Sequence, residues 1–381
     1  MEMYKMMTPG PTMTAASVLQ ARSRNFVNPD VDTDFCEEYH TICRELADLL
    51  DTENEVYILG GEGILALEAA CASLTEPGDR VLVIDNGVFG KGFADFVKLY
   101  GGEPVLYTTD YHRPVDIEGL GDYLAGDHHF KYATVVHCDT PSGVLNDIGA
   151  ICPMLKEYGI LTVTDAVASM FGEEIHVDDW GIDIICGGSQ KALSAPPGLA
   201  FVSVSGDAMR AMRHRKTPVA SFYCNLLLFQ NYYEEKWFPY TMPVSDIYGF
   251  AEAVRLVRED TDRIRRHHRI AGAVRRAVKA AGLSLYLDRG DAATVTVINV
   301  PDGIKDTDII RVMKEQYHIL IAGSFDVLAG KVIRLGHMGN NANTDDVAQM
   351  MAALTKTLDQ LGFHCQCDMG EIFLKEVSDV F

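Results

Sequence analysis

The chain lacks long hydrophobic runs, and this absence excludes a class of protein. Nowhere in its 381 residues is there an unbroken apolar stretch of the ~20 residues that a helix needs to cross a bilayer. The first residues, Met1 to Pro11, also lack the basic start and the apolar core of a signal peptide. We therefore expect a cytoplasmic protein that does not act in a membrane.

Basic residues are scarce as well. Lysine and arginine number 33 against 54 aspartates and glutamates, so the formal net charge is −21. Nucleic acids and anionic membranes bind to basic surfaces, and we expect neither as a partner. The nine cysteines are scattered, which is typical of reduced, buried thiols. Cys365 and Cys367 have no second pair nearby, so no metal site is predicted.

The sequence also lacks internal repeats and any linker rich in proline, glycine and serine. Its length nevertheless favours two domains. Between residues 55 and 205, short apolar runs alternate with helical patterns such as 63–74 and 93–101, which predicts a doubly wound α/β domain with a mostly parallel sheet. The predicted strands are 55–61, 79–87, 132–140, 159–167, 182–189 and 198–206.

After Pro243 the pattern changes to long helical periodicity over residues 244–282, followed by shorter strands and helices. This order predicts a small C-terminal α+β domain, with the boundary inside the long helix. The predicted units are an N-terminal arm packing on the small domain (1–22), a large cofactor-binding domain (23–255) and a small domain (256–381).

Ligands of open parallel sheets collect at the carboxyl ends of the strands, where two residues stand out. Lys191 lies in the tight, proline-rich stretch "CGGSQKALSAPPG", where burial could lower its pKa and make it a nucleophilic amine. Asp165 ends an apolar strand, where a carboxylate needs a cationic partner such as a pyridinium nitrogen. A surface lysine and a helix-capping aspartate are the plainer interpretations of the same residues.

Three further signals are weaker when taken alone. The glycines of "GGEGILALEAA" precede a helix and could bind an anion, although they do not complete a dinucleotide fingerprint. Phe89 could stack on a flat ring, and Arg334, late in a strand, could hold a carboxylate. The alternative for Phe89 is packing in the core, and the alternative for Arg334 is a surface salt bridge.

Taken together, these motifs resemble the class V aminotransferases, which are pyridoxal-phosphate enzymes, and their alanine–glyoxylate and serine–pyruvate group most of all. The resemblance runs from "TPGPT" at Thr8 through "GSQKALSAPPG" to "RLGHMG". It implies the aspartate-aminotransferase-like fold of type I pyridoxal enzymes. It also implies a homodimer with the active site at the subunit interface, acting on a small-molecule amino donor and a 2-oxo acid.

The resemblance also implies roles for individual residues. Lys191 matches the lysine that forms the Schiff base with the cofactor and shuttles the proton. Asp165 matches the aspartate that keeps the ring nitrogen protonated. The remaining implied contacts are Phe89 stacked on the ring, Thr140 near its oxygen, Val167 beneath it, Gly63, Ile64 and Gln190 at the phosphate, Thr241 reaching that phosphate from the partner subunit, and Arg334 on the substrate carboxylate.

Two departures from the family pattern affect the phosphate site. Glu62 stands where relatives carry a small or hydroxyl residue, and Phe238 stands where many carry a tyrosine. Two like charges ~4 Å apart repel by about 4 kcal/mol at an effective dielectric near 20. This pattern favours unphosphorylated pyridoxal over pyridoxal 5'-phosphate, and hence amino transfer from pyridoxamine to pyruvate.

Other residues keep the phosphate-using alternative open. Gln190 and Thr241 remain, and Phe325 stands where a pyridoxamine-using relative carries an arginine. Alanine or serine transamination with glyoxylate or pyruvate therefore stays an alternative.

Three other functions fit the sequence poorly. A cysteine desulfurase needs a reactive cysteine in the small domain, but none occurs between Cys224 and Cys365. An NAD(P)-type oxidoreductase could use Asp85 but lacks the glycine fingerprint. A cofactor-binding regulator would need an added DNA-binding domain, for which the chain has no room.

Overall fold

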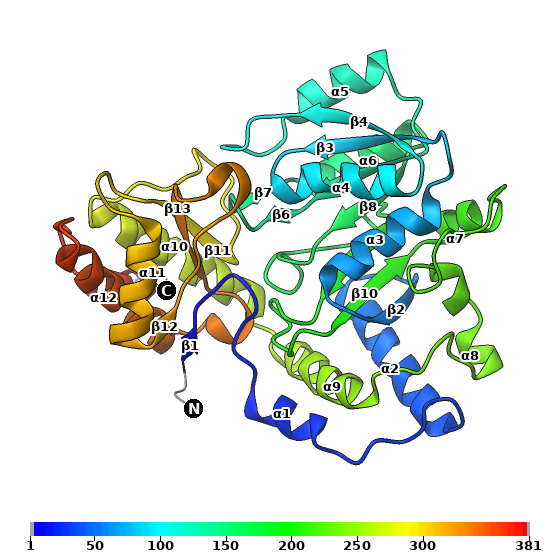
Figure 1. The fold of residues 1–381 in the computed structure, drawn as a ribbon, viewed down its shortest axis with the longest axis horizontal. Helices are drawn as coiled ribbons and strands as arrows, with labels where there is room; N and C mark the ends of the chain where they lie inside the picture. The colour runs from blue at the N-terminus through cyan, green and yellow to red at the C-terminus, as the bar shows by residue number, and fades with distance from the viewer. Residues whose placement is uncertain (1–3, 379–381) are drawn as a thin grey trace.

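The computed structural model describes residues 4–378. Residues 1–3 and 379–381, which belong to the predicted arm and small domain, lie outside the described residues. Two units lie side by side, and the N-terminal segment runs between them (Figure 1). No helix within the described range is long and apolar enough to cross a bilayer.

The larger unit is built on a seven-stranded sheet with the order β2-β10-β9-β8-β5-β3-β4. Strands β5 and β9 are buried at every position, as expected for strands covered on both faces. The strand bounds are β2 Glu55–Gly60, β3 Arg80–Asp85, β4 Glu103–Thr108, β5 Tyr132–Val136, β8 Leu161–Asp165, β9 Ile184–Gly188 and β10 Leu199–Val204.

The predicted α/β fold with a mostly parallel sheet is confirmed, with three differences in the strands. Strand β4, at the edge of the sheet, was not predicted, because its partly exposed residues do not form a continuous apolar run. Strand β10 is antiparallel to both of its neighbours, which its apolar sequence does not reveal. The strand expected over 132–140 is divided into β5 and β6 (Cys138–Asp139), and β6 forms a separate hairpin with β7 (Val144–Leu145).

Helices cover the sheet and join its strands. Helix α3 packs on β8, β9 and β10, and α4 packs on β3, β4 and β5, so both helices begin close to the sheet's carboxyl edge. The helices of this unit are α1 Ala16–Arg22, α2 Thr33–Leu49, α3 Gly63–Leu74, α4 Val88–Leu99, α5 Ile117–Gly126, α6 Ile148–Glu157, α7 Gly206–Arg213, η1 Leu226–Phe229, α8 Tyr232–Glu235 and α9 Val244–Glu259.

The smaller unit has its own hydrophobic core, in which Met7 from the N-terminal segment also lies. The long helix expected over 244–282 is two helices, because α9 ends at Glu259 and α10 begins at Arg263. The apolar run over 318–324 forms only the short strand β12. The elements are β1 Lys5–Met6, α10 Arg263–Ala280, β11 Val295–Asn299, α11 Asp306–Tyr317, β12 Ile319–Leu320, η2 Asp326–Leu328, β13 Val332–Gly336, η3 Gly339–Asn341, α12 Thr344–Gln360 and α13 Met369–Ser378.

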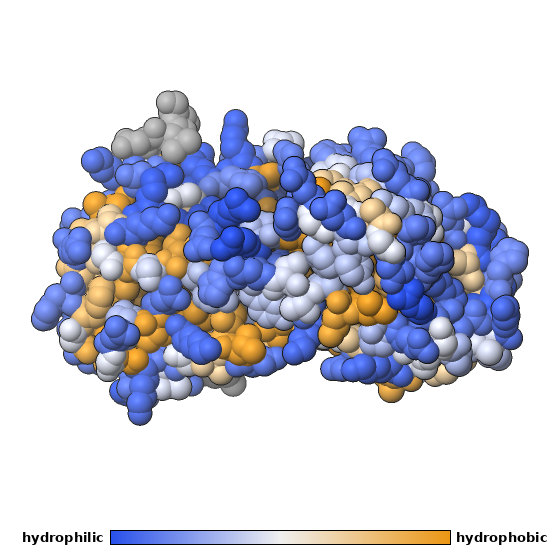
Figure 2. Space-filling view, turned by 90° about the horizontal axis from the view of Figure 1, so that it is seen from above, coloured by the Kyte–Doolittle hydropathy of each residue, from blue (hydrophilic) through white to orange (hydrophobic). Residues whose placement is uncertain are grey.

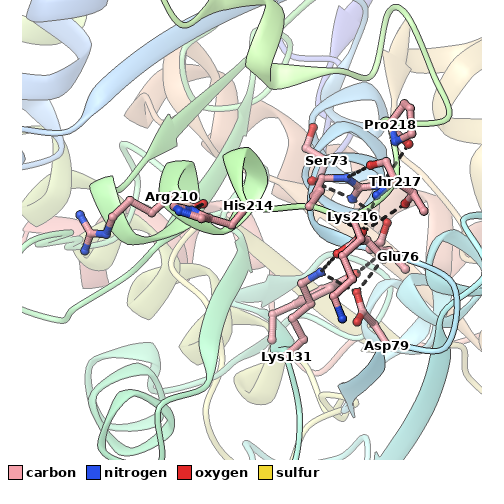
Figure 3. A network of polar contacts seen from close by, with 12 residues as sticks. Ser73, Glu76, Asp79, Lys131, Arg210, His214, Lys216, Thr217 and Pro218 are labelled. Carbon is pink, nitrogen blue, oxygen red and sulfur yellow. Dashed lines mark hydrogen bonds and ion pairs between the residues drawn. The ribbon is translucent and has the colours of Figure 1, made fainter.

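A polar network fixes the far end of α3. The Arg215 guanidinium donates to the carbonyl oxygens of Ser73 at 3.0 Å and Thr75 at 2.6 Å, which belong to the end of that helix. Figure 3 shows Glu76 beside Lys131 and the backbone of the 216–218 segment. These contacts anchor α3 and so hold its opposite end at the carboxyl edge of the sheet.

The surface agrees with the acidic, polar composition. The face in Figure 2 is mostly hydrophilic, with separate hydrophobic patches over both units. Large exposed hydrophobic side chains gather in two segments of the larger unit, 26–31 and 222–237, and they are Phe26, Val31, Phe222, Tyr223 and Trp237.

Candidate active site

A cavity of about 160 Å³ lies at the carboxyl edge of the large sheet. The parallel strands direct their following loops to this edge, so residues distant in sequence meet there. The lining residues are Glu62, Gly63, Ile64, Leu67, Phe89, Cys138, Thr140, Asp165, Val167, Ala168, Gln190 and Lys191. Nine of them are residues that the sequence pattern indicates, and Leu67, Cys138 and Ala168 were not predicted.

Lys191 lies in a tight turn directly after β9. The turn is closed by the Ser194 amide, which donates to the Lys191 carbonyl at 2.8 Å. Lys191 Nζ donates to the carbonyl oxygen of Pro9 at 2.7 Å. A Cβ at Gly10 would lie 2.7 Å from Nζ, so the N-terminal segment can cover the amine only with a glycine there.

Burial makes this amine unusual. Burial, together with the nearby positive charge of Arg334, lowers the pKa of Lys191 to about 8. A lysine of this kind is a reactive nucleophile near neutral pH. The N-terminal contact was not predicted, because its donor and acceptor are 182 residues apart in the chain.

Asp165 ends β8 and is 5% exposed. Its carboxylate accepts a hydrogen bond from the Val167 amide at 2.9 Å, and burial raises its pKa to about 7. Between residues 4 and 378, no lysine, arginine or histidine nitrogen lies within 4.0 Å of its oxygens. The site therefore offers a buried carboxylate to a cationic ligand.

Glu62 occupies the beginning of α3. One carboxylate oxygen accepts from the Ile64 amide at 3.1 Å, and the other accepts from Gln190 Nε2 at 3.1 Å. A helix N-terminus attracts anions through its free amides and its dipole. Here the protein's own carboxylate already uses these donors. Gly63 is required at the next position, because a Cβ would lie 2.8 Å from Val167 Cγ2.

Aromatic and hydroxyl groups form another wall. Phe89 lies in the first turn of α4, and its ring meets the Phe325 ring edge-on, with centroids 5.9 Å apart. Thr140 follows β6 and is buried at 3% exposure. With Val167, these side chains surround the volume between Lys191 and Asp165.

Arg334 lies on β13 of the smaller unit and is not among the residues that line the cavity, but it contacts Thr140, which is. Its Nε donates to the Gly323 carbonyl at 2.6 Å, and its Nη1 donates to the Thr140 carbonyl at 3.4 Å. It is 9% exposed, and burial lowers its pKa to about 10. In the described part of the chain no carboxylate lies within 4.0 Å of its guanidinium, so its positive charge is available to an anion.

Two expected cofactor contacts lie elsewhere in this chain. Phe238 is buried in the core against Phe35 and Tyr39, with ring centroids 5.8 and 4.9 Å away, so it does not line the cavity. Thr241 is exposed and its hydroxyl lies 3.4 Å from Asp30 Oδ2, outside the cavity.

Comparisons of the sequence and of the structure with known proteins all indicate the same family. The family model for aminotransferase class-V matches residues 8–350. An uncharacterized aminotransferase of Methanocaldococcus jannaschii is 35% identical over 98% of this chain and 97% of its own length. The pyridoxamine–pyruvate transaminase of Mesorhizobium japonicum is 31% identical over 93% and 92%. The crystal structure of ureidoglycine–glyoxylate aminotransferase from Bacillus subtilis superposes with a TM-score of 0.95 at 29% identity, covering 100% and 99%.

Proposed function

Because this chain belongs to the class V aminotransferases and is therefore a transaminase, we propose that it transfers the amino group of pyridoxamine to pyruvate, giving pyridoxal and alanine. Enzymes of this family depend on pyridoxal phosphate, held as a Schiff base on a lysine. When bound, the pyridine ring supplies an electron sink for the carbon that loses its proton.

The side chains of the cavity suit such a ring. Asp165 offers a buried carboxylate without a cationic partner, which a protonated ring nitrogen would satisfy. Phe89 and Val167 lie on the cavity wall and would contact the two faces of the ring. Thr140 would contact its hydroxyl.

Lys191 supplies the reactive amine. Its lowered pKa leaves Nζ substantially neutral near pH 8, so that Nζ can attack an aldehyde and can also accept a proton. The carbonyl of Pro9 accepts a hydrogen bond from Nζ and keeps it beside the cavity. We assign to Nζ the proton transfer between the amino-bearing carbon and the acceptor.

Arg334 is the group that would hold the acceptor. A guanidinium binds a carboxylate through paired, charged hydrogen bonds. The Gly323 and Thr140 carbonyls fix its orientation but leave its charge unneutralised. A small 2-oxo acid such as pyruvate would place its carboxylate there.

The position of Glu62 is the observation that carries the choice of donor. Its two oxygens engage the Ile64 amide and Gln190 Nε2, the donors that a phosphate would need. A phosphorylated ligand would have to displace this carboxylate or lie beside it against charge repulsion. An unphosphorylated donor neither displaces the Glu62 carboxylate nor is repelled by its charge.

The test is a direct assay of the reaction. Purified protein is incubated with pyridoxamine and pyruvate, and alanine is measured, with pyridoxamine 5'-phosphate as the competing donor. We expect alanine from pyridoxamine and little from the phosphorylated form. Absence of alanine, together with turnover of alanine and glyoxylate after loading with pyridoxal phosphate, would refute the proposal.

A substitution tests the reason for that selectivity. Glu62→Ser should raise the affinity for pyridoxal phosphate at least about tenfold, because the amide and Gln190 become free for the phosphate. Glu118→Ser, an exposed glutamate in the first turn of α5, is the matched control and should leave the affinity unchanged. Equal affinities in wild type and Glu62→Ser would show that Glu62 does not oppose the phosphate.

One observation favours a second candidate. If Glu62 rotates away, the Ile64 amide and Gln190 Nε2 form a phosphate-binding pair at a helix N-terminus. The chain would then be a pyridoxal-phosphate-dependent aminotransferase acting on alanine or serine with glyoxylate or pyruvate. The relative from Bacillus subtilis is named for glyoxylate, and the assay above distinguishes the two candidates.

We also propose that the enzyme is a homodimer. The side chains of Phe26, Val31, Phe222, Tyr223 and Trp237 form an exposed apolar set, and exposed apolar side chains that gather in a few segments are typical of a protein interface. Phe26 lines an open groove formed by residues 26–30 and 241–246, which contains Thr241. A second subunit covering this surface would bring Thr241 toward the partner's site.

A further inference from the structure

Asp139 is a buried carboxylate to which neither the sequence motifs nor the proposed reaction assigns a role. It ends β6 and is fully buried. Among the residues described, no cationic nitrogen lies within 4.0 Å of its oxygens. Burial raises its pKa, and hydrogen bonds from neighbouring donors counteract that effect. A charge in such a position needs explanation, because removing it from water is costly.

The Asp139 carboxylate is hydrogen-bonded to two segments that carry lining residues of the cavity. Oδ1 accepts from the Phe89 amide at 2.9 Å, at the beginning of α4. Oδ2 accepts from the Ser142 hydroxyl at 2.8 Å and from the Ser142 amide at 3.3 Å. The carboxylate thus caps the helix that carries Phe89 and closes the turn that carries Thr140.

The approach of α4 to Asp139 depends on a glycine. Gly87 precedes the helix with φ +152°, and a Cβ there would lie 2.3 Å from Asp139 Cγ. Any other residue would therefore separate the helix from the carboxylate. The "DNGVF" stretch therefore packs directly against the Asp139 carboxylate.

Asp139 also acts on Arg334. The Thr140 carbonyl, in the residue after Asp139, accepts a hydrogen bond from Arg334 Nη1. The negative charge of Asp139 opposes the effect of burial on the guanidinium and favours its charged form.

We propose that Asp139 is a positioning residue of this site, which fixes Phe89 and the Thr140–Ser142 turn and, through the Thr140 carbonyl, the orientation of Arg334. The inference rests on the proposed transaminase reaction, in which Phe89 would contact the ring and Arg334 the acceptor's carboxylate. Asp139 itself touches neither of these ligands.

Two substitutions of Asp139 test its effect on Arg334 and its effect on Phe89 separately. Asp139→Asn keeps an oxygen for the Phe89 amide but removes the charge. Its amide nitrogen would face the two Ser142 donors, so the turn whose Thr140 carbonyl orients Arg334 should loosen. KM for pyruvate should rise at least tenfold and kcat change less than threefold, because the contact to the bound acid is weakened. Asp139→Ala also removes the helix cap. It should in addition lose most of the visible circular dichroism of the pyridoxal-loaded protein, since Phe89 no longer holds the ring.

Two controls exclude a general structural effect. Asp147 caps α6 by accepting from the Ala150 amide at 3.0 Å, and Asp147→Asn removes the charge of a comparable cap away from the cavity. Asp368 accepts from the Gly370 amide at 2.7 Å at the beginning of α13, and Asp368→Asn removes the charge there in the same way. Both variants should keep KM within twofold of wild type and retain the circular dichroism.

The outcomes are decisive in each case. A wild-type KM in Asp139→Asn would overturn the proposed support of Arg334, and wild-type circular dichroism in Asp139→Ala would overturn the positioning of Phe89. If Asp139→Ala does not fold, KM in Asp139→Asn still tests the effect on Arg334. The positioning of Phe89 is then tested by comparing two variants: the circular dichroism should be retained in Asp139→Asn and lost in Gly87→Val. If wild type makes no alanine from pyridoxamine, the proposed donor fails separately, and KM is then measured for glyoxylate.

Discussion

At the scale of single residues, Lys191 combines a predictable position with an environment that the sequence does not reveal. Its place after an apolar strand, like that of Asp165, follows from the motif and the rule for strand ends. The hydrogen bond to Pro9 and the nearby charge of Arg334 depend on tertiary contacts between distant segments. Phe238 shows the same limit, because no local pattern distinguishes a core phenylalanine from one that faces a ligand.

The reactivity of Lys191 should follow its pKa. At about pH 7.5 a lysine of pKa about 8 is roughly one quarter neutral, whereas an ordinary lysine is neutral in about one molecule per thousand. The rate of Schiff-base formation with pyridoxal, followed by absorbance, should rise with pH and level off above about 8. Arg334→Gln removes a positive charge that disfavours the ammonium form of Lys191. The pKa of Lys191, and with it the midpoint of this rise in rate, should therefore move to higher pH.

Arg311→Gln serves as the control for that shift, since Arg311 is an exposed residue of α11 whose ion-pair partners among the described residues, Asp308 and Glu315, lie on its own helix. Its midpoint should equal that of wild type. A midpoint in Arg334→Gln that stays in place or moves to lower pH would contradict the assignment of the charge effect.

At the scale of elements, the hydrophobic patterns located the strands well but not their direction or their ends. Strand β10 is as fully buried as the parallel strands, so burial alone cannot indicate that it is antiparallel. The break between α9 and α10 falls at 260–262, where both flanking helices keep a helical pattern. Helix α3 illustrates how an element is held: Glu62 accepts at its beginning, and Arg215 donates at its end.

Removal of the cap at the end of α3 should destabilise the larger unit. Arg215→Ala leaves the carbonyls of Ser73 and Thr75 without their charged donor, and hydrogen bonds of this type contribute about 1.5–3 kcal/mol. We expect the thermal midpoint of the protein to fall by at least about 2 °C. Arg210→Ala should change it by less than about 1 °C, because Arg210 pairs only with Asp207 on the exposed face of α7.

At the scale of the whole molecule, two units with separate cores share one site. The Lys191 turn comes from the larger unit, and Arg334 comes from the smaller one. The resemblance predicted this architecture, and the structural neighbours confirm the fold. The domain limits at 22 and 255 stay predictions, as does the subunit interface, because a single chain determines neither.

The proposed dimer gives a prediction at this scale. Phe222→Asp combined with Trp237→Asp places two charges in the exposed apolar set, and sedimentation should change from dimer to monomer. The monomer should also bind pyridoxal more weakly, because the site would lose the partner's contribution. Leu374→Asp, an exposed leucine on α13, should leave the dimer intact, and a dimer that survives the double substitution would exclude this surface as the interface.

The N-terminal segment has a consequence for biosynthesis. Its strand β1 pairs with β12, the Met6 carbonyl accepts from Asn341, and Pro9 covers Lys191. Residues 5–9 can therefore make this full set of contacts only after the chain has been synthesised as far as Asn341. The segment that covers the reactive amine is fixed in place only from that point on.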